Sequence, residues 1–110
     1  MVTVGSFDMD LPEEAFWEIY YYFDFLITDN NYQTEALKIG RDAIYISYSN
    51  KLLHKKILIK MLFEYRQYEI SFRVFNRFGK TLLNVKEDDV NSIVKFAEFI
   101  SLHYSSYYSR

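Results

Sequence analysis

The sequence predicts an α+β domain of two layers, in which an N-terminal helix, a three- to four-stranded antiparallel meander and a C-terminal helix follow one another. Three observations lead to this prediction. Apolar residues recur at helical spacing near both ends, they alternate with polar residues in between, and glycine and proline are scarce. Since a helix and a sheet each bury one apolar face, we expect both helices on one face of the sheet. The 110 residues are expected to form a single domain spanning 1–110.

The first predicted element is a helix from Leu11 to Ile27. Asp10 is a candidate N-cap with Glu13 three residues on, and Pro12 lies in the first turn, where its missing N–H has no intrahelical partner to lose. An Asp-Asn-Asn sequence ends this helix, and residues 32–39 are expected as one further helical turn or irregular chain. The predicted core stripe of the helix consists of Phe16, Ile19, Tyr20, Phe23, Leu26 and Ile27.

Alternation of apolar and polar residues predicts strands at 43–49, 56–65 and 68–76. The second and third are expected to form a tight hairpin with Arg66-Gln67 as its loop, and residues 81–85 are a candidate fourth strand. The inward-facing residues are predicted to be Ile44, Ile46, Tyr48, Ile57, Ile59, Met61, Phe63, Tyr65, Tyr68, Ile70, Phe72 and Val74.

The last predicted element is a helix from Asp88 to Tyr104. Asp88 and Asp89 are expected at its N-terminal end, where negative charge is stabilised by the helix dipole. Its apolar stripe is predicted to contain Val90, Ile93, Phe96, Ala97, Ile100 and Tyr104.

The residue types needed for catalysis are not grouped in this sequence. There is no cysteine, His54 and His103 have no ligand-type partner at metal spacing, and the three glycines stand apart. We therefore expect neither catalytic residues, nor a metal, nor a cofactor, and the protein is predicted not to be an enzyme. The lack of cysteine, of a signal peptide and of a transmembrane stretch predicts a cytoplasmic protein without membrane contact. The overall composition is typical of a low-GC bacterium or its phages.

Charge is distributed unevenly along the chain. Residues 1–37 contain eight acidic residues and no Lys or Arg, whereas residues 38–80 contain ten basic and three acidic residues. The net charge of −2 therefore conceals an acidic N-terminal part and a basic middle part, which predict two different surfaces.

The outer side of the first predicted helix combines acidic and aromatic residues. Aromatic residues recur there at i, i+4 and i+8, roughly opposite the core stripe, and carboxylates flank them. Exposed aromatic area rimmed by charge is typical of an interface, so we expect it to bind a basic protein, such as a toxin or nuclease. The open alternative is that residues 32–39 or the last helix cover it. We call this set the acidic-aromatic ridge: Glu14, Trp17, Glu18, Tyr21, Asp24 and Phe25.

A second candidate surface is the outer face of the sheet, where Lys60, Arg73, Phe75 and Arg77 are expected. Basic residues interleaved with aromatic rings bind single-stranded nucleic acid by phosphate contacts and base stacking. The pI of about 5.6 and the acidic start of the last helix disfavour this alternative.

The sequence thus predicts a non-enzymatic protein-binding module. In size, acidic first helix and layout it is similar in kind to immunity proteins, antitoxins and phage-encoded inhibitors, a likeness that carries no motif. One alternative is a nucleic-acid-binding module. Another is a homo-oligomer, in the simplest case a homodimer, that hides both aromatic surfaces in its own interface.

Overall fold

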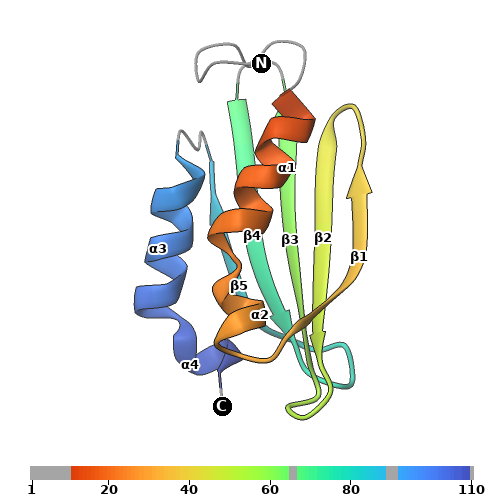
Figure 1. The fold of residues 1–110 in the computed structure, drawn as a ribbon, viewed down its shortest axis with the longest axis vertical. Helices are drawn as coiled ribbons and strands as arrows, with labels where there is room; N and C mark the ends of the chain where they lie inside the picture. The colour runs from red at the N-terminus through yellow and green to blue at the C-terminus, as the bar shows by residue number, and fades with distance from the viewer. Residues whose placement is uncertain (1–10, 65–66, 89–91, 110) are drawn as a thin grey trace.

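A computed structural model describes residues 11–64, 67–88 and 92–109 of the chain. It confirms the α+β class, with the helices packed on one face of an antiparallel sheet (Figure 1). In chain order the elements are α1 (Leu11–Tyr22), α2 (Phe25–Thr28), β1 (Gln33–Ile39), β2 (Ala43–Asn50), β3 (Lys55–Glu64), β4 (Gln67–Phe75), β5 (Thr81–Glu87), α3 (Ile93–His103) and α4 (Ser105–Tyr108). The predicted N-cap, Asp10, lies outside the described residues.

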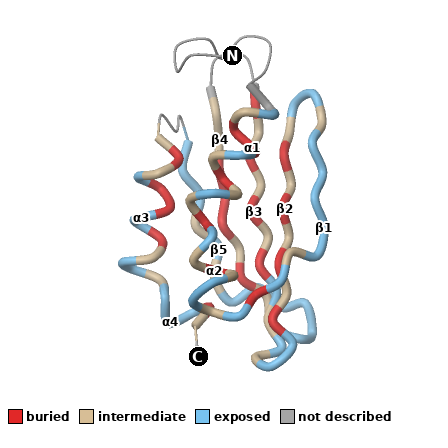
Figure 2. Tube along the Cα trace, in the orientation of Figure 1, coloured by how far each residue is buried: buried red, intermediate tan, exposed pale blue. Residues whose placement is uncertain are grey.

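The sheet has five strands in the order β1-β2-β3-β4-β5, not three to four. The additional strand is β1, so the prediction of a helical turn or irregular chain over residues 32–39 was wrong. β1 runs along one edge of the sheet, from Gln33 opposite Ser49 to Ile39 opposite Ile44, with a bulge between Thr34 and Ala36. Because only one edge of β1 is paired and most of its residues are exposed (Figure 2), burial imposes no alternation on its sequence.

The core lies between the sheet and the helices. The predicted alternation in β2, β3 and β4 is confirmed, and the inward residues that are fully buried include Ile44, Ile46, Tyr48, Ile57, Ile59, Ile70, Phe72 and Val74. The C-terminal segment closes the core at one end. The Tyr32 hydroxyl donates a hydrogen bond of 2.7 Å to the carbonyl oxygen of Tyr108, whose ring centroid lies 5.8 Å from that of Phe72.

The predicted first helix is divided into α1 and α2. At the junction, the amide of Asp24 bonds to the carbonyl of Tyr21 at 3.2 Å, and the amide of Leu26 bonds to the carbonyl of Phe23 at 3.1 Å. These bonds span three residues rather than four, which tightens the turn and rotates the residues that follow it. Phe23 and Leu26 are nevertheless fully buried, as predicted.

The last helix begins at Ile93, not at Asp88. Ser92 is its N-cap, and the hydroxyl oxygen of Ser92 accepts a hydrogen bond of 3.3 Å from the amide of Lys95. Asp88 therefore does not lie at the N-terminal end of the helix, contrary to the prediction. Asp89 and Val90 lie outside the described residues. The buried residues Ile93, Phe96, Ala97 and Ile100 confirm four members of the predicted stripe, whereas Tyr104 is the C-cap of the helix and is only partly buried.

The hairpin between β3 and β4 is confirmed, with its register shifted from the prediction. Glu64 lies opposite Gln67, so Gln67 belongs to β4 and is not part of the loop. The two intervening residues, Tyr65 and Arg66, lie outside the described residues.

Candidate functional site

Two aromatic residues of the acidic-aromatic ridge lie on the outer side of α1. Trp17 is 58% exposed and Tyr21 is 72% exposed, whereas Phe16 and Ile19 on the opposite side of the same helix are buried. The Trp17 ring packs edge-on against Phe16 at 5.0 Å between centroids, and the Tyr21 ring packs edge-on against Tyr22 at 5.0 Å. These contacts within one helix restrict both rings without burying them.

Glu14 and Glu18 lie one helical turn apart, beside Trp17 and Tyr21, because residues three and four apart are neighbours on a helix surface. Burial raises the pKa of the Glu18 carboxyl above its ordinary value, and the nearby Glu14 carboxylate raises it further. The two carboxylates therefore repel each other, and a cation placed between them would relieve that repulsion.

The other two members of the ridge are placed differently. Asp24 is exposed at the junction of α1 and α2, and its carbonyl oxygen accepts a 2.9 Å hydrogen bond from the amide of Ile27. Phe25 is half-buried, and its ring centroid lies 5.7 Å from that of Phe23 and 5.9 Å from that of Tyr108. The tight turn at the junction thus removes Phe25 from the line of Trp17 and Tyr21 and packs it against the core.

Neither residues 32–39 nor the last helix covers Trp17 and Tyr21. Residues 33–39 form the edge strand β1, and α3 lies beside α1 on the same face of the sheet (Figure 1). Trp17 and Tyr21 remain highly exposed with both segments packed in the domain.

The outer face of the sheet carries three of the four residues of the alternative site. Lys60 on β3 lies opposite Ser71, and the guanidinium carbon of Arg73 on β4 lies 5.5 Å from the centroid of the Phe75 ring. Arg77 lies beyond the end of β4, in the turn to β5, rather than on the sheet face where it was expected.

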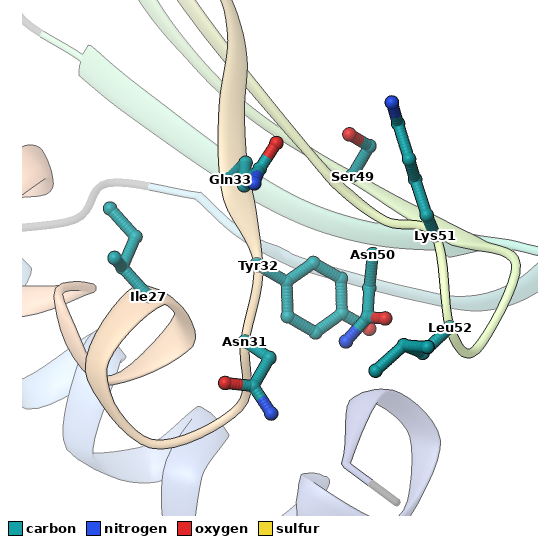
Figure 3. Close-up of a pocket in the computed structure, with 8 residues that line it drawn as sticks. All are labelled: Ile27, Asn31, Tyr32, Gln33, Ser49, Asn50, Lys51 and Leu52. Carbon is teal, nitrogen blue, oxygen red and sulfur yellow. The ribbon is translucent and has the colours of Figure 1, made fainter.

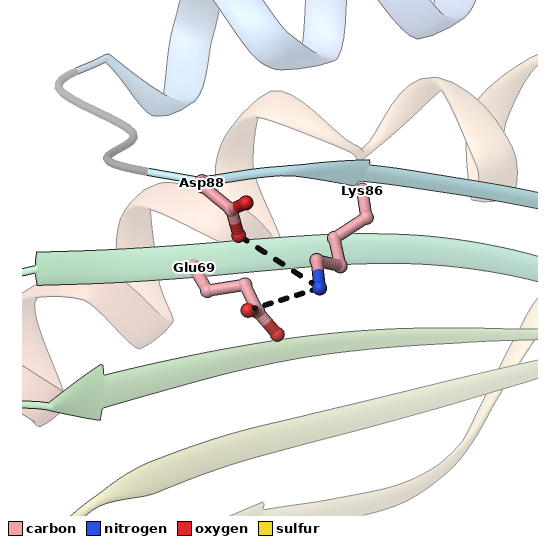
Figure 4. Close-up of polar contacts among 3 residues, drawn as sticks. All are labelled: Glu69, Lys86 and Asp88. Atoms are coloured by element: carbon pink, nitrogen blue, oxygen red, sulfur yellow. Dashed lines mark ion pairs between the residues drawn. The ribbon is translucent and has the colours of Figure 1, made fainter.

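Part of the positive charge on this outer face is neutralised. The Lys86 ammonium lies 3.4 Å from the Glu69 carboxylate and 3.9 Å from that of Asp88 (Figure 4). Lys56 pairs with Glu35 across the sheet at 3.4 Å. The face is therefore of mixed charge, with Lys60 and Arg73 outside these ion pairs.

The sheet end formed by the β2–β3 and β4–β5 loops is hollowed, which sequence reasoning did not predict. One hollow of about 430 Å³ lies between the start of β1 and the β2–β3 loop, with Tyr32, Asn50 and Leu52 among its lining residues (Figure 3). A second, of about 400 Å³, lies between the two loops, and five of its eleven lining residues are basic. The lysines that line it could be identified from the sequence, but their position around the same hollow as Arg77 depends on the tertiary structure.

No group of three or more His, Asp or Glu side chains in residues 11–64, 67–88 and 92–109 is placed to hold a metal ion. No helix in the same ranges has the length and apolar content that a membrane span requires. Comparisons of the chain with protein-family models, with curated proteins and with solved structures give no match.

Proposed function

We propose that this protein is a non-enzymatic binding module of the inhibitor, immunity or antitoxin type, which binds and blocks a basic protein through α1. The observation that supports this best is the exposure of Trp17 and Tyr21 on a helix whose opposite side is already buried. A helix needs only one apolar face to pack on a sheet, so a second aromatic face has no structural role within the domain.

The charge of α1 supports a basic partner. Both acidic residues of its first turn, Glu13 and Glu14, are uncompensated by any basic residue in its last turn. Glu14 and Glu18 repel each other next to the aromatic rings, and a Lys or Arg of the partner would stabilise both carboxylates. Rigid aromatic rings supply contact area at low entropic cost, while carboxylates at the rim accelerate association. We expect this binding to take place in the cytoplasm, as the sequence predicts.

The proposal is tested by capturing the partner with the full chain and measuring its binding kinetics. Trp17→Ala and Tyr21→Ala are each expected to raise the dissociation rate, with a loss of about 2 kcal/mol or more, as for aromatic residues at the centre of an interface. Glu14→Gln and Glu18→Gln are expected mainly to slow association, less so at high salt. The thermal midpoint should remain nearly unchanged, because Trp17 and Tyr21 lie outside the core.

Matched controls are available on α3, where Leu102 is exposed to a similar degree and Glu98 is exposed. Leu102→Ala and Glu98→Gln should leave binding intact. The proposal fails if the captured protein is released equally by Leu102→Ala, or if Trp17→Ala unfolds the domain. Sedimentation equilibrium of wild type and Tyr21→Ala tests the homodimer alternative, since a dimer formed through α1 would dissociate in the variant.

Nucleic-acid binding is the second candidate, because Lys60, Arg73 and Phe75 share the outer face of the sheet. We expect only weak, salt-sensitive binding of single-stranded RNA or DNA, with a dissociation constant of about 10⁻⁴ to 10⁻⁶ M at physiological salt. Titration of labelled oligonucleotides at several salt concentrations measures it. A sub-micromolar affinity that is lost in Lys60→Glu and Arg73→Glu would place this function above protein binding.

A further inference from the structure

The basic hollow lies where two loops meet at one end of the sheet. Residues 51–54 join β2 to β3 and residues 76–80 join β4 to β5, and both loops lie at the same end in Figure 1. The hollow has a volume of about 400 Å³. Its basic lining residues are Lys51, His54, Lys55, Lys56 and Arg77.

Both loops are held in place by side chains that bond to the backbone. The Asn76 carboxamide oxygen accepts hydrogen bonds of 2.9 Å from the amides of Phe78 and Lys80, and Gly79 adopts a φ of 80°, which favours glycine. The buried Asn50 accepts a 3.0 Å bond from the Leu53 amide. The backbone of both loops is therefore held in place before a ligand binds, which lowers the entropic cost of binding.

The positive charge of the hollow is only partly balanced. Its lining contains one carboxylate, that of Glu35, which pairs with Lys56 at 3.4 Å. The Lys55 ammonium donates a 2.7 Å hydrogen bond to the carbonyl of Tyr107. Lys51 and Arg77 have no carboxylate partner among the described residues, although the whole chain has a net charge of −2. Cations that face one small hollow repel each other, and a bound anion would relieve that repulsion.

One wall of the hollow is aromatic. Phe75 lies at the end of β4, opposite Lys56, and is part of the lining together with Arg77. A half-buried ring next to Lys and Arg side chains suits a ligand with a flat organic part and an anionic group.

We propose that this hollow binds a small phosphate ester of the nucleoside monophosphate class. Lys51 and Arg77 bind the phosphate group by charge-assisted hydrogen bonds, and the Phe75 ring packs against the base. The volume falls in the range of small-molecule sites, and Lys51 and Arg77, from two different loops, both line the same hollow. This site shares no residue with the surface of α1 and does not depend on the function proposed for it.

The test is a titration of the ¹⁵N-labelled full chain with adenosine monophosphate, inorganic phosphate, adenosine and acetate at constant ionic strength. Adenosine monophosphate should shift the amides of residues 49–56 and 75–79 to saturation. Inorganic phosphate should shift the same amides with weaker affinity, because it cannot contact Phe75, and acetate and adenosine should bind more weakly still. Lys51→Glu and Arg77→Glu should each lower the affinity for adenosine monophosphate by about tenfold or more, as expected for loss of a charge-assisted hydrogen bond.

Lys60→Glu is the matched control, because it makes the same charge change on the sheet face outside the hollow. It should alter the affinity by less than about twofold, since exposed charges beyond a Debye length are largely screened. The proposal is overturned if millimolar adenosine monophosphate causes no saturable shifts, or if acetate binds equally well. It is also overturned if Lys60→Glu lowers the affinity for adenosine monophosphate as much as Lys51→Glu does. Trp17→Ala should bind adenosine monophosphate like wild type, which separates this result from the outcome for α1. The amide spectrum of each variant reports whether it is folded.

Discussion

Replacing Phe72 with alanine is expected to lower the free energy of unfolding by about 3–5 kcal/mol, the usual cost of removing a buried aromatic ring. Phe72 lies on β4 and has no exposed surface. Its ring is stacked with Phe23 at 5.8 Å between centroids and meets Tyr108 edge-on, also at 5.8 Å. The substitution would thus remove contacts of the sheet with the junction between α1 and α2 and with α4. Urea unfolding followed by circular dichroism measures the effect.

Phe78→Ala is the matched control for this experiment, because it deletes the same side chain from the turn between β4 and β5. Phe78 is 82% exposed, so its loss should change the free energy of unfolding by no more than about 0.5 kcal/mol. Similar urea midpoints for the two variants would contradict the placement of Phe72 in the core.

Raising the pH above about 10, the ordinary pKa of tyrosine, is expected to unfold the domain. Burial raises the pKa of the Tyr32, Tyr48 and Tyr108 hydroxyls, that of Tyr108 to about 12. The folded state therefore holds these protons more tightly than the unfolded state, so their stabilising contribution is complete below pH 10 and is lost as the pH rises through the folded values. Since one pKa unit corresponds to about 1.4 kcal/mol, the combined loss from the three groups should be large enough to measure against a typical domain stability.

Urea unfolding at a series of pH values from neutral to strongly alkaline measures this loss, and Tyr48→Phe identifies its source. The Tyr48 hydroxyl is buried without a hydrogen-bond partner among the described residues, so its removal should cost little stability at neutral pH. The same substitution should flatten the alkaline decline. An unchanged decline in Tyr48→Phe would show that this hydroxyl ionises as readily in the folded state as in the unfolded chain.

The strands that could be predicted from the sequence are those with one face in the core. In β2 every second residue is buried, and the buried apolar residues of β3 and β4 also lie two apart, so that constraint appears directly as alternation. β1 is not subject to this constraint. Its residues Glu35, Ala36, Leu37 and Lys38 are common in helices, and they form a strand because the exposed edge of β2 provides hydrogen bonds.

The ends of the helices were predicted less well, for two different reasons. Ser92 immediately precedes the apolar stripe of α3 and is a recognisable N-cap, so the start of that helix was in principle readable from the sequence. The junction at Phe23 and Asp24 contains neither glycine nor proline, and nothing in the sequence marks it. Because of this junction, Phe25 packs against the core while Trp17 and Tyr21 remain exposed.

The order of the strands also has a consequence for how the chain folds. Every neighbouring pair in the sheet is also consecutive in sequence, so each pairing closes only a short loop and one hairpin extends the next. The contact between Tyr32 and Tyr108 joins residues 76 positions apart, and it forms only when the C-terminal segment returns to the sheet. Fast zipping of the meander followed by slower docking of the two chain ends is the sequence of events that loop-closure entropy favours for this topology.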